Sequence, residues 1–405
     1  MSSAADRFMR YISIDTQSDP DSESTPSTAK QFVLARLLAE EMSAIGISDV
    51  RLDDRHCYVY GDIPASCDAE LPSVGFIAHL DTSPDAPGDA SGARTVTDYD
   101  GGVIKLSDNV SLDPESSPGL KNYVGCDLIV TDGVSLLGAD DKAGIAEIMT
   151  MAERLISDPS IPHGRIGIAF TSDEEICGNA RFFDIEGFGM DYAYTVDGGA
   201  IGEIEYENFN AAEAIVYIAG RNIHPGDAKD VMVNAVRIAA ELDVLLPQAE
   251  RPEHTEGYDG FFHLTSLSGD VTEAESRYII RDHDDDRFSE KIELMKKCAD
   301  YLNAKYKNAV EIVIHEQYRN MKKLIVPHMF LIDNAVKAFT ACGVEPLIKP
   351  IRGGTDGAML TCRGLPCPNL STGGHNFHSN TEYIPVQSLE KMADVLVELA
   401  SLPAI

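Results

Sequence analysis

The stretch Leu136-Leu137-Gly138-Ala139-Asp140-Asp141-Lys142-Ala143-Gly144 places two adjacent carboxylates between a glycine-bearing turn and an apolar run. Apolar residues then recur at helical spacing, at Ile145, Ile148, Met149, Ala152, Leu155 and Ile156. We therefore expect the carboxylates at or just before the N-terminus of a helix, where a strand has ended. Open α/β sheets build their sites at such strand ends. Two interpretations stay open: an Asp that caps the helix, or an Asp that holds a metal ion.

Short apolar runs predict strands whose ends carry acidic residues or histidine. The strands are expected over residues 74–78, 128–131, 165–170 and 192–196. They lead into His79-Leu80-Asp81, Asp132-Gly133, Asp173-Glu174-Glu175 and Asp197-Gly198-Gly199. Helical segments alternate with these strands, after amphipathic helices over 5–14 and 28–45. This alternation predicts a doubly wound α/β fold.

A second domain is predicted as an insertion between residues 209 and 320. Its elements follow the order β-α-β-β-α-β, with strands over 211–219, 260–268, 274–282 and 310–314 and helices over 230–246 and 288–306. That order is typical of the ferredoxin-like split βαβ fold. Residues 1–208 and 321–405 would then form the first domain, to which a helix over 328–342 and the region 350–378 return. A length of 405 residues also favours two domains.

Composition argues against several classes of partner. Acidic residues outnumber basic ones 66 to 33, giving a formal net charge of -33, which disfavours nucleic acid because phosphates need Lys and Arg patches. No run approaches the ~20 apolar residues of a membrane span, and residues 1–10 lack the apolar core of a signal peptide. The 8 cysteines include no CxxC pair, so we expect free thiols and a cytoplasmic protein.

The first candidate ligands lie at the strand end His79-Leu80-Asp81 and in the Asp140-Asp141 pair before the predicted helix. His79 and Asp81 are two apart, so in an extended segment they point the same way, and Asp81 can orient a metal-binding His79. The two oxygens of one carboxylate can bridge a pair of cations ~3.5–4 Å apart. Asp140 and Asp141 are both suited to this role, and spacing alone does not choose between them.

Further candidates complete a set of nitrogen and oxygen donors. Glu174 and Glu175 would repel each other without a cation, and one can be a ligand while the other is a general base. Asp197 precedes two glycines, and either His375 or His378 can supply a ligand from a Gly-rich loop. Each residue alone also fits a purely structural role, such as an Asp in a turn or a His on the surface. Together, without thiolates, they predict a dinuclear hydrolytic site for zinc, with cobalt or manganese as alternatives.

Longer ordered strings identify a family. The chain resembles the M20 metallopeptidase family from Thr16 to Glu382, in the segments Gly75–Asp85, Leu137–Glu147, Tyr194–Gly199, Asn222–Gly226, Tyr278–Asp282 and Pro350–Gly357. The resemblance implies a zinc domain with an inserted ferredoxin-like domain that dimerises. Such long strings in a fixed order are far more specific than any single motif.

The resemblance also implies a ligand set for two zinc ions per chain. His79, Asp140 and Asp197 would bind one ion. Asp140, Glu175 and His378 would bind the other, so Asp140 is the bridge. Choosing Asp140 over Asp141 rests on the family pattern.

The same resemblance implies roles for the remaining polar residues. Glu174 would be the general base, and Asp81 the residue that orients His79. His224 of the inserted domain would lie near the substrate. Arg281 and Arg352 would bind a substrate carboxylate, a task that suits a planar guanidinium.

The activity implied is that of an aminopeptidase releasing the N-terminal residue of tripeptides, acting as a homodimer on short peptides with a free N-terminus. Two rivals stay open: another M20 activity, such as a dipeptidase or an N-acyl amino acid deacylase, and an inactive relative that only binds peptides. One position departs from the pattern, because relatives often carry a basic residue or His just before Glu382, where this chain has Thr381.

Overall fold

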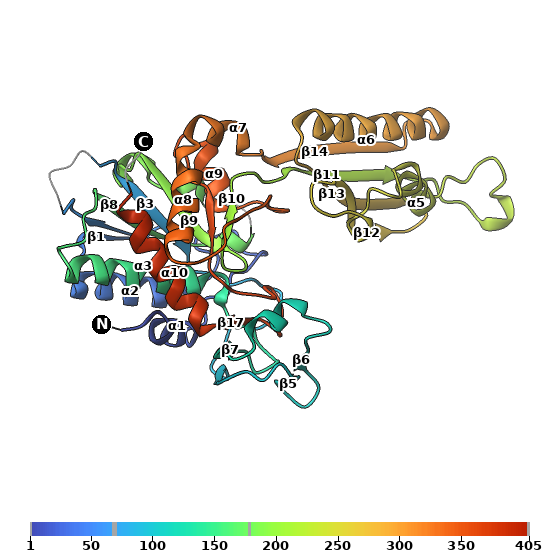
Figure 1. Cartoon of the computed structure of the whole chain (residues 1–405). Coiled ribbons are helices and arrows are strands. Elements are labelled where there is room, and N and C mark those ends of the chain that lie inside the picture. The colour runs from blue at the N-terminus through green and yellow to red at the C-terminus, as the bar shows by residue number, and fades with distance from the viewer. Residues whose placement is uncertain (1, 67–70, 177–179, 403–405) are drawn as a thin grey trace. The chain divides into compact units, whose positions relative to one another are not determined.

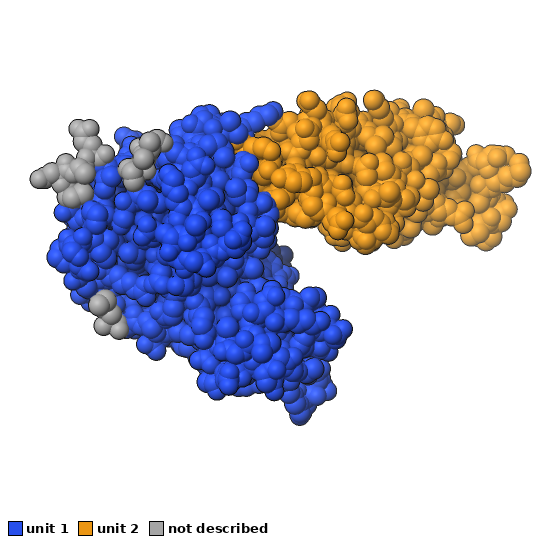
Figure 2. Space-filling view, viewed as in Figure 1, with its two compact units in different colours: residues 1–206, 323–349, 355–405 blue, residues 207–322, 350–354 orange. Residues whose placement is uncertain are grey.

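The computed structural model describes residues 2–66, 71–176 and 180–402, which form two compact units (Figures 1 and 2). Unit 1 comprises Met1–Tyr206, Lys323–Lys349 and Thr355–Ile405, and unit 2 comprises Glu207–Lys322 and Pro350–Gly354. The short return segment Pro350–Gly354 thus groups with unit 2, whereas the sequence assigned residues 350–378 to the first domain. A backbone hydrogen bond from Ile351 N to Glu207 O, at 2.8 Å, ties it there.

Unit 1 is built on an eight-stranded sheet in the order β1-β2-β8-β3-β9-β16-β10-β15. The strands, in that order, are Ser48–Asp53, Tyr58–Ile63, Ile166–Thr171, Val74–His79, Tyr192–Gly198, Asn369–Ser371, Glu203–Glu205 and Leu347–Ile348. Strand β3 pairs in parallel with both β8 and β9, and all residues of β3 and β8 are buried. Parallel strands buried on both faces read as continuous apolar runs, which is why the sequence located them.

Helices cover this sheet (Figure 1). Helix α3 packs against β3 and β9, and α1 and α10 pack against α3. Because α3 lies between the sheet and other helices, nearly all of it is buried, in contrast to a half-exposed surface helix. The helices of unit 1 are α1 Ala4–Ile12, α2 Gln31–Ile45, α3 Ala139–Ser157, α4 Ile185–Phe188, α8 Phe330–Ala341, α9 Asp356–Cys362 and α10 Val386–Ala400, and α7 Lys322–Ile325 begins at the boundary.

One predicted strand lies in a different sheet. Strand β7, Leu128–Val130, joins a separate three-stranded sheet in the order β17-β7-β4, with Tyr383–Pro385 and Arg94–Val96. The expectation that it belongs to the doubly wound sheet is therefore wrong, and Asp132 does not lie at that sheet's edge. A three-residue apolar run carries no signal for which sheet it joins. A small two-stranded sheet, β5 Ile104–Lys105 with β6 Ser111–Leu112, accompanies it.

Unit 2 has the ferredoxin-like order that the sequence predicted. Its four strands form an antiparallel sheet in the order β12-β13-β11-β14, and α5 and α6 pack against it. The buried core between them includes Val216, Leu242 and Tyr278. The elements are β11 Asn210–Ala219, α5 Ala235–Leu245, β12 Phe261–Gly269, β13 Glu273–Asp282, α6 Asp285–Tyr306 and β14 Val310–Tyr318.

Two smaller expectations concern cysteines and membrane segments. Cys57, Cys126, Cys298, Cys342 and Cys367 are free thiols in the described chain, while Cys67 and Cys177 lie outside the described residues. Among the described helices, none combines the length and apolar character needed to cross a bilayer.

Candidate active site

The candidate site of unit 1 lies where the parallel strands end. Strand β3 ends at the buried His79, and its Cα pairs with that of Thr171 at the end of β8. Strand β8 leads directly to Glu174 and Glu175, which form a short 3-10 turn. Asp197 is the last residue but one of strand β9. The sheet therefore brings together acidic and histidine side chains that are more than a hundred residues apart in the chain, from His79 to Asp197.

Asp140 stands between two groups of side chains. Its Oδ1 lies 2.9 Å from Nε2 of His79, and the same nitrogen lies 3.4 Å from Oδ1 of Asp197. Its Oδ2 lies 3.3 Å from Nε2 of His378, which is 2.9 Å from Oε2 of Glu175. Each oxygen of Asp140 thus faces a different nitrogen-and-carboxylate set. A carboxylate that bridges two cations needs this arrangement.

The neighbouring Asp141 is used differently. Its Oδ2 accepts the backbone N–H of His79 at 3.0 Å and its Oδ1 that of Gly144 at 3.3 Å, so it ties the end of β3 to the start of α3. Asp141, His79 and Asp197 also form a group whose possible ligand atoms lie within 4.8 Å of one another. Because two backbone donors occupy the Asp141 carboxylate, Asp140 is the better-placed bridge.

Asp81 connects two strand ends. It is fully buried, and its Oδ1 and Oδ2 accept the backbone N–H groups of Glu174, at 2.9 Å, and Glu175, at 3.2 Å. Nδ1 of His79 lies 3.0 Å from the Asp81 carbonyl oxygen and 3.4 Å from its Oδ1. The Asp81 carbonyl is thus the nearer partner of the His79 ring, and the Asp81 carboxylate fixes the Glu174-Glu175 turn.

Burial and like charge shift the carboxyl groups of the site away from their usual state. Burial, together with Asp197, raises the pKa of Glu174 well above its usual value. Burial and Asp140 raise the pKa of Glu175 to about 7. For Asp197, burial raises the pKa to about 8 although His79 opposes the shift. The site thus holds more negative charge than its surroundings compensate.

The two histidines supply part of the compensation. Burial lowers the pKa of His79. The carboxylates of Asp197, Asp140 and Asp81 raise it by more than burial lowers it, so the pKa is well above its usual value. Hydrogen bonds to Asp140 and Glu175 raise the pKa of His378 to about 11. Oε1 of Glu175 is buried and has no hydrogen-bond partner among the described residues. An orphaned buried oxygen among crowded carboxylates is the arrangement that bound cations would satisfy, so these residues fit a metal site.

His375, the other histidine of the loop, points away from the carboxylates. Its Nε2 lies 2.8 Å from the Tyr123 hydroxyl, and its ring stacks on Tyr383 with centroids 4.8 Å apart. Burial lowers its pKa to about 4. Packing explains His375, and His378 is the loop residue that faces Asp140.

Sequence reasoning missed the buried Glu382. Its Oε2 accepts the backbone N–H groups of Leu137 at 2.7 Å and Gly138 at 2.9 Å, and its Oε1 accepts that of Asp140 at 3.1 Å. The one available signal was an ionisable residue directly before the apolar strand β17. The neighbouring Thr381 lies with its hydroxyl 2.9 Å from Ser379 Oγ and so serves the loop itself.

The three predicted substrate residues belong to unit 2. His224 is exposed, and its Nδ1 accepts the backbone N–H of Gly226 at 3.1 Å. Arg281 donates to Gln317 Oε1 at 3.0 Å, and its guanidinium lies over the Tyr318 ring. Within unit 2 the structure thus gives these side chains local partners.

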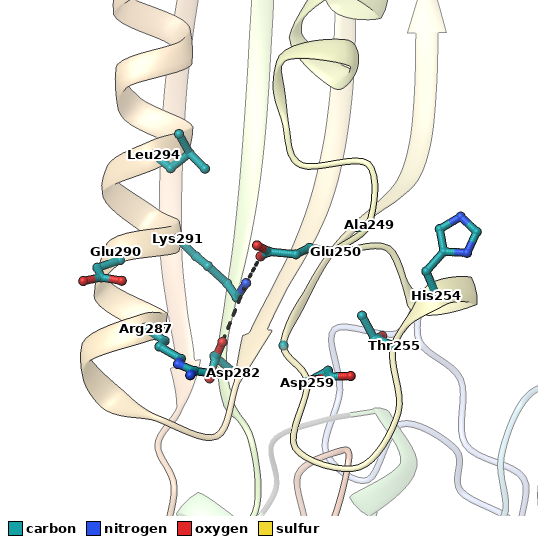
Figure 3. A pocket seen from close by; sticks show the side chains of 11 residues that line it. Ala249, Glu250, His254, Thr255, Asp259, Asp282, Arg287, Glu290, Lys291 and Leu294 are labelled. Carbon is teal, nitrogen blue, oxygen red and sulfur yellow. Dashed lines mark hydrogen bonds and ion pairs between the residues drawn. The ribbon is translucent and has the colours of Figure 1, made fainter.

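Arg352 is the most heavily engaged of the three. It donates to the carbonyl oxygens of Gly257 at 2.7 Å and Asp259 at 3.0 Å, and to the Thr255 hydroxyl at 3.1 Å. Thr255 and Asp259 line a polar cavity of about 440 Å³ beside α6 (Figure 3). Arg352 therefore holds one wall of that cavity.

Comparison with known proteins assigns the chain to a family. Residues 206–310 match the M20 peptidase dimerisation domain. Peptidase T of Alkaliphilus oremlandii is 51% identical over 99% of this chain and 99% of its own length. Peptidase T of Desulfitobacterium hafniense strain Y51 is 52% identical over 100% of this chain and 99% of its own. This chain belongs to the peptidase T family of M20 metallopeptidases. The resemblance drawn from the sequence is thereby confirmed.

Solved structures agree with this fold. The aminopeptidase PepT from Bacillus cereus matches with a TM-score of 0.77 at 23% identity, covering 98% of this chain and 97% of that one. A tripeptidase from Staphylococcus aureus matches with a TM-score of 0.77 at 21% identity, with the same coverage of 98% and 97%. A dinuclear metal binding M20 peptidase from Bacillus subtilis matches with a TM-score of 0.66 at 13% identity, covering 98% and 96%. This chain and these structures share one fold.

Proposed function

We propose that this chain is a tripeptide aminopeptidase, which hydrolyses the first peptide bond of a tripeptide and releases the N-terminal residue. Peptidase T relatives about half identical over the whole chain support the proposal. The observation that carries it is the position of Asp140, whose two oxygens face His79 and His378 at 2.9 and 3.3 Å. Dinuclear hydrolases hold two neighbouring metal ions in a pair of sites of this kind.

Two zinc ions per chain would occupy these sites, with cobalt or manganese as alternatives. His79, Asp140 and Asp197 would hold one ion, and Asp140, Glu175 and His378 the other. When bound, the metals supply Lewis acidity, which lowers the pKa of water and polarises the substrate carbonyl.

Glu174 would be the proton carrier. Its backbone is fixed by Asp81, and burial raises the pKa of its carboxyl group, which makes the carboxylate a stronger base. Glu174 would accept a proton from the attacking water as the new C–O bond forms. It would then deliver that proton to the leaving nitrogen as the C–N bond breaks, so the reaction consumes one water and needs no other reactant.

Unit 2 would supply substrate recognition. The acidic site suits the N-terminal ammonium of a peptide, while Arg281 and Arg352 would bind the far carboxylate and His224 would stabilise the oxyanion. Fixing both ends of a short peptide selects for length. Arg352 would exchange its contacts with the 255–259 loop for contacts with the substrate carboxylate.

The matched dimerisation domain supports a homodimer. We also assign the enzyme to the cytoplasm.

The test compares three substrates, Ala-Ala-Ala, Ala-Ala and N-acetyl-Ala-Ala-Ala, with products identified by mass spectrometry. We expect alanine and Ala-Ala from the first, little turnover of the others, loss of activity with a chelator and recovery with zinc. Glu174→Ala should abolish turnover while metal content stays near two ions per chain. Preferred cleavage of Ala-Ala would favour a dipeptidase, cleavage of the acetyl group a deacylase, and binding without cleavage an inactive relative.

A further inference from the structure

We propose that Glu382 is a positioning residue that joins the Asp140 turn to the His378 loop and thereby sets the spacing of the two metal positions. The inference rests on the proposed metal site of the enzyme. Glu382 is 1% exposed, and its two oxygens accept the backbone N–H groups of Leu137, Gly138 and Asp140 at 2.7, 2.9 and 3.1 Å. In the described part of the chain, the hydrogen bonds that its carboxylate accepts come from backbone N–H groups of the Asp140 turn, so it acts through that turn.

The turn before α3 needs an acceptor from elsewhere in the chain. The first N–H groups of a helix have no partner within the helix. The capping position, Gly138, has no side chain, and its φ of 79° is in the left-handed region that favours glycine. Asp140 itself has φ -87° and ψ 103°, which are not helical angles. Glu382, 242 residues further along the chain than Asp140, accepts the N–H groups of this turn, while Asp141 accepts the N–H of Gly144 at 3.3 Å.

Because Glu382 accepts the backbone N–H groups of the turn, the Asp140 carboxylate can face the site. If Asp140 capped its own helix, its carboxylate would be directed to backbone N–H groups rather than to His79 and His378. With Glu382 satisfying the turn, both Asp140 oxygens face histidine nitrogens instead. Glu382 and Asp141 thus accept the backbone N–H groups around the start of α3, and the Asp140 carboxylate is left for the proposed bridge.

The other end of Glu382 is fixed to the loop that carries His378. Its backbone N–H donates to Ser379 O at 3.3 Å, and its carbonyl accepts from Thr131 N at 3.4 Å. Tyr383 and His375 then close the loop with two backbone hydrogen bonds, at 2.9 and 3.1 Å. His378 lies inside this closed loop, so moving Glu382 would shift His378 relative to Asp140.

Glu382→Gln tests the role with almost no change in shape. A carboxylate offers acceptors on both sides, whereas an amide offers one oxygen and one NH2. Whichever way the Gln amide turns, its NH2 meets a backbone N–H donor of the turn. Glu382→Asp keeps both acceptors but shortens their reach by one methylene. Glu205→Gln is the matched control, because Glu205 is also a buried unit 1 glutamate, accepting from Asn369 Nδ2 at 2.7 Å on strand β10.

The primary readout is zinc affinity of the metal-free protein, measured by competition with a chromophoric chelator, so it needs no substrate. Residues behind metal ligands commonly change affinity about 10- to 100-fold. We expect Glu382→Gln to weaken at least one of the two zinc steps by about that factor, Glu382→Asp to weaken it less, and Glu205→Gln to leave both unchanged. At saturating zinc, kcat for Ala-Ala-Ala should stay reduced in Glu382→Gln while KM changes little.

Wild-type affinity at both zinc steps in Glu382→Gln would overturn the inference, as would equal weakening in Glu205→Gln, which would indicate general loosening of unit 1. If Glu382→Gln does not fold, Glu382→Asp decides by the same titration. A wild-type protein that binds zinc but does not cleave Ala-Ala-Ala would refute the proposed function, while zinc weakening confined to the Glu382 variants would still support the positioning role.

Discussion

Asp81 Oδ1 accepts the backbone N–H of Glu174 at 2.9 Å, and the same oxygen lies 3.4 Å from Nδ1 of His79. One buried residue thus contacts both the proposed base and a proposed metal ligand, and its carbonyl oxygen lies still nearer to Nδ1 of His79, at 3.0 Å. Its other carboxylate oxygen accepts from Glu175 N at 3.2 Å. The end of β3 and the turn after β8 are therefore positioned together rather than separately.

Replacing Asp81 by Asn should impair catalysis without unfolding the chain. The Asn NH2 would face one of the two backbone donors, and the His79 ring would lose its anionic partner. We expect kcat to fall about 10- to 100-fold, the usual range for residues behind metal ligands, measured with Ala-Ala-Ala at saturating zinc. Asp191→Asn is the control, because Asp191 accepts from Ser73 N on the surface, at 2.9 Å. A kcat within twofold of wild type in Asp81→Asn would contradict this role.

Removing metal should destabilise unit 1. Without cations the crowded carboxylates repel one another, and a ligand that binds only the folded state stabilises it by about 4 kcal/mol at a thousand times its Kd. We expect a chelator to lower Tm by several degrees and zinc to restore it in a concentration-dependent way. Asp140→Asn should lose most of this response, because the bridge is missing. A wild-type Tm that does not depend on zinc would count against the site.

Arg352→Lys should change which peptide ends the enzyme accepts. A lysine replaces the planar fork by one ammonium and cannot bind a carboxylate through two parallel hydrogen bonds. We expect the wild-type enzyme to prefer Ala-Ala-Ala over its C-terminal amide, and Arg352→Lys to lose about tenfold or more of that preference in kcat/KM, corresponding to about 1.4 kcal/mol.

Arg277→Lys is the matched control for that measurement. Arg277 also lies in unit 2, where it pairs with Glu275 at 2.7 Å on the exposed sheet. Its substitution should leave the preference for a free carboxylate unchanged. If Arg352→Lys keeps the wild-type preference, the three hydrogen bonds from Arg352 to residues 255–259 are its whole function.

The strand ends of the site could be predicted because the pattern of apolar residues along the sequence indicates which strands are buried. Strands β3, β8 and β9 are continuous apolar runs, and parallel pairing brings their ends to one edge. His79, Glu174 and Asp197 follow directly from this rule. The same reasoning placed strand β7 in the wrong sheet, because its apolar run is equally suited to the small sheet with β4 and β17.

The relationships that depend on tertiary contact had no such signal. Glu382 meets the Asp140 turn across 242 residues, and no local pattern distinguishes it from any other glutamate before a strand. The distinction between Asp140 and Asp141 likewise came from the family resemblance. The structure adds a physical reason, since Asp141 is occupied by the N–H groups of His79 and Gly144. The segment Pro350–Gly354 was misassigned because five residues are too few to carry a domain signal.

Glu147 provides a stability prediction far from catalysis. It lies on α3 and is fully buried, and within the described chain neither carboxyl oxygen has a hydrogen-bond partner. Burial and Glu390 raise its pKa well above its usual value. The folded state then keeps a proton that the unfolded chain releases above about pH 4.3, so stability should fall as pH rises from there toward the folded pKa, by about 1.4 kcal/mol per pH unit. Glu147→Gln cannot ionise and should lose this contribution, becoming the more stable protein near neutral pH. Urea unfolding at about pH 5 and about pH 7, in saturating zinc, measures the difference. The exposed Glu40→Gln should follow wild type, and parallel slopes for wild type and Glu147→Gln would show that Glu147 is ionised in the folded chain.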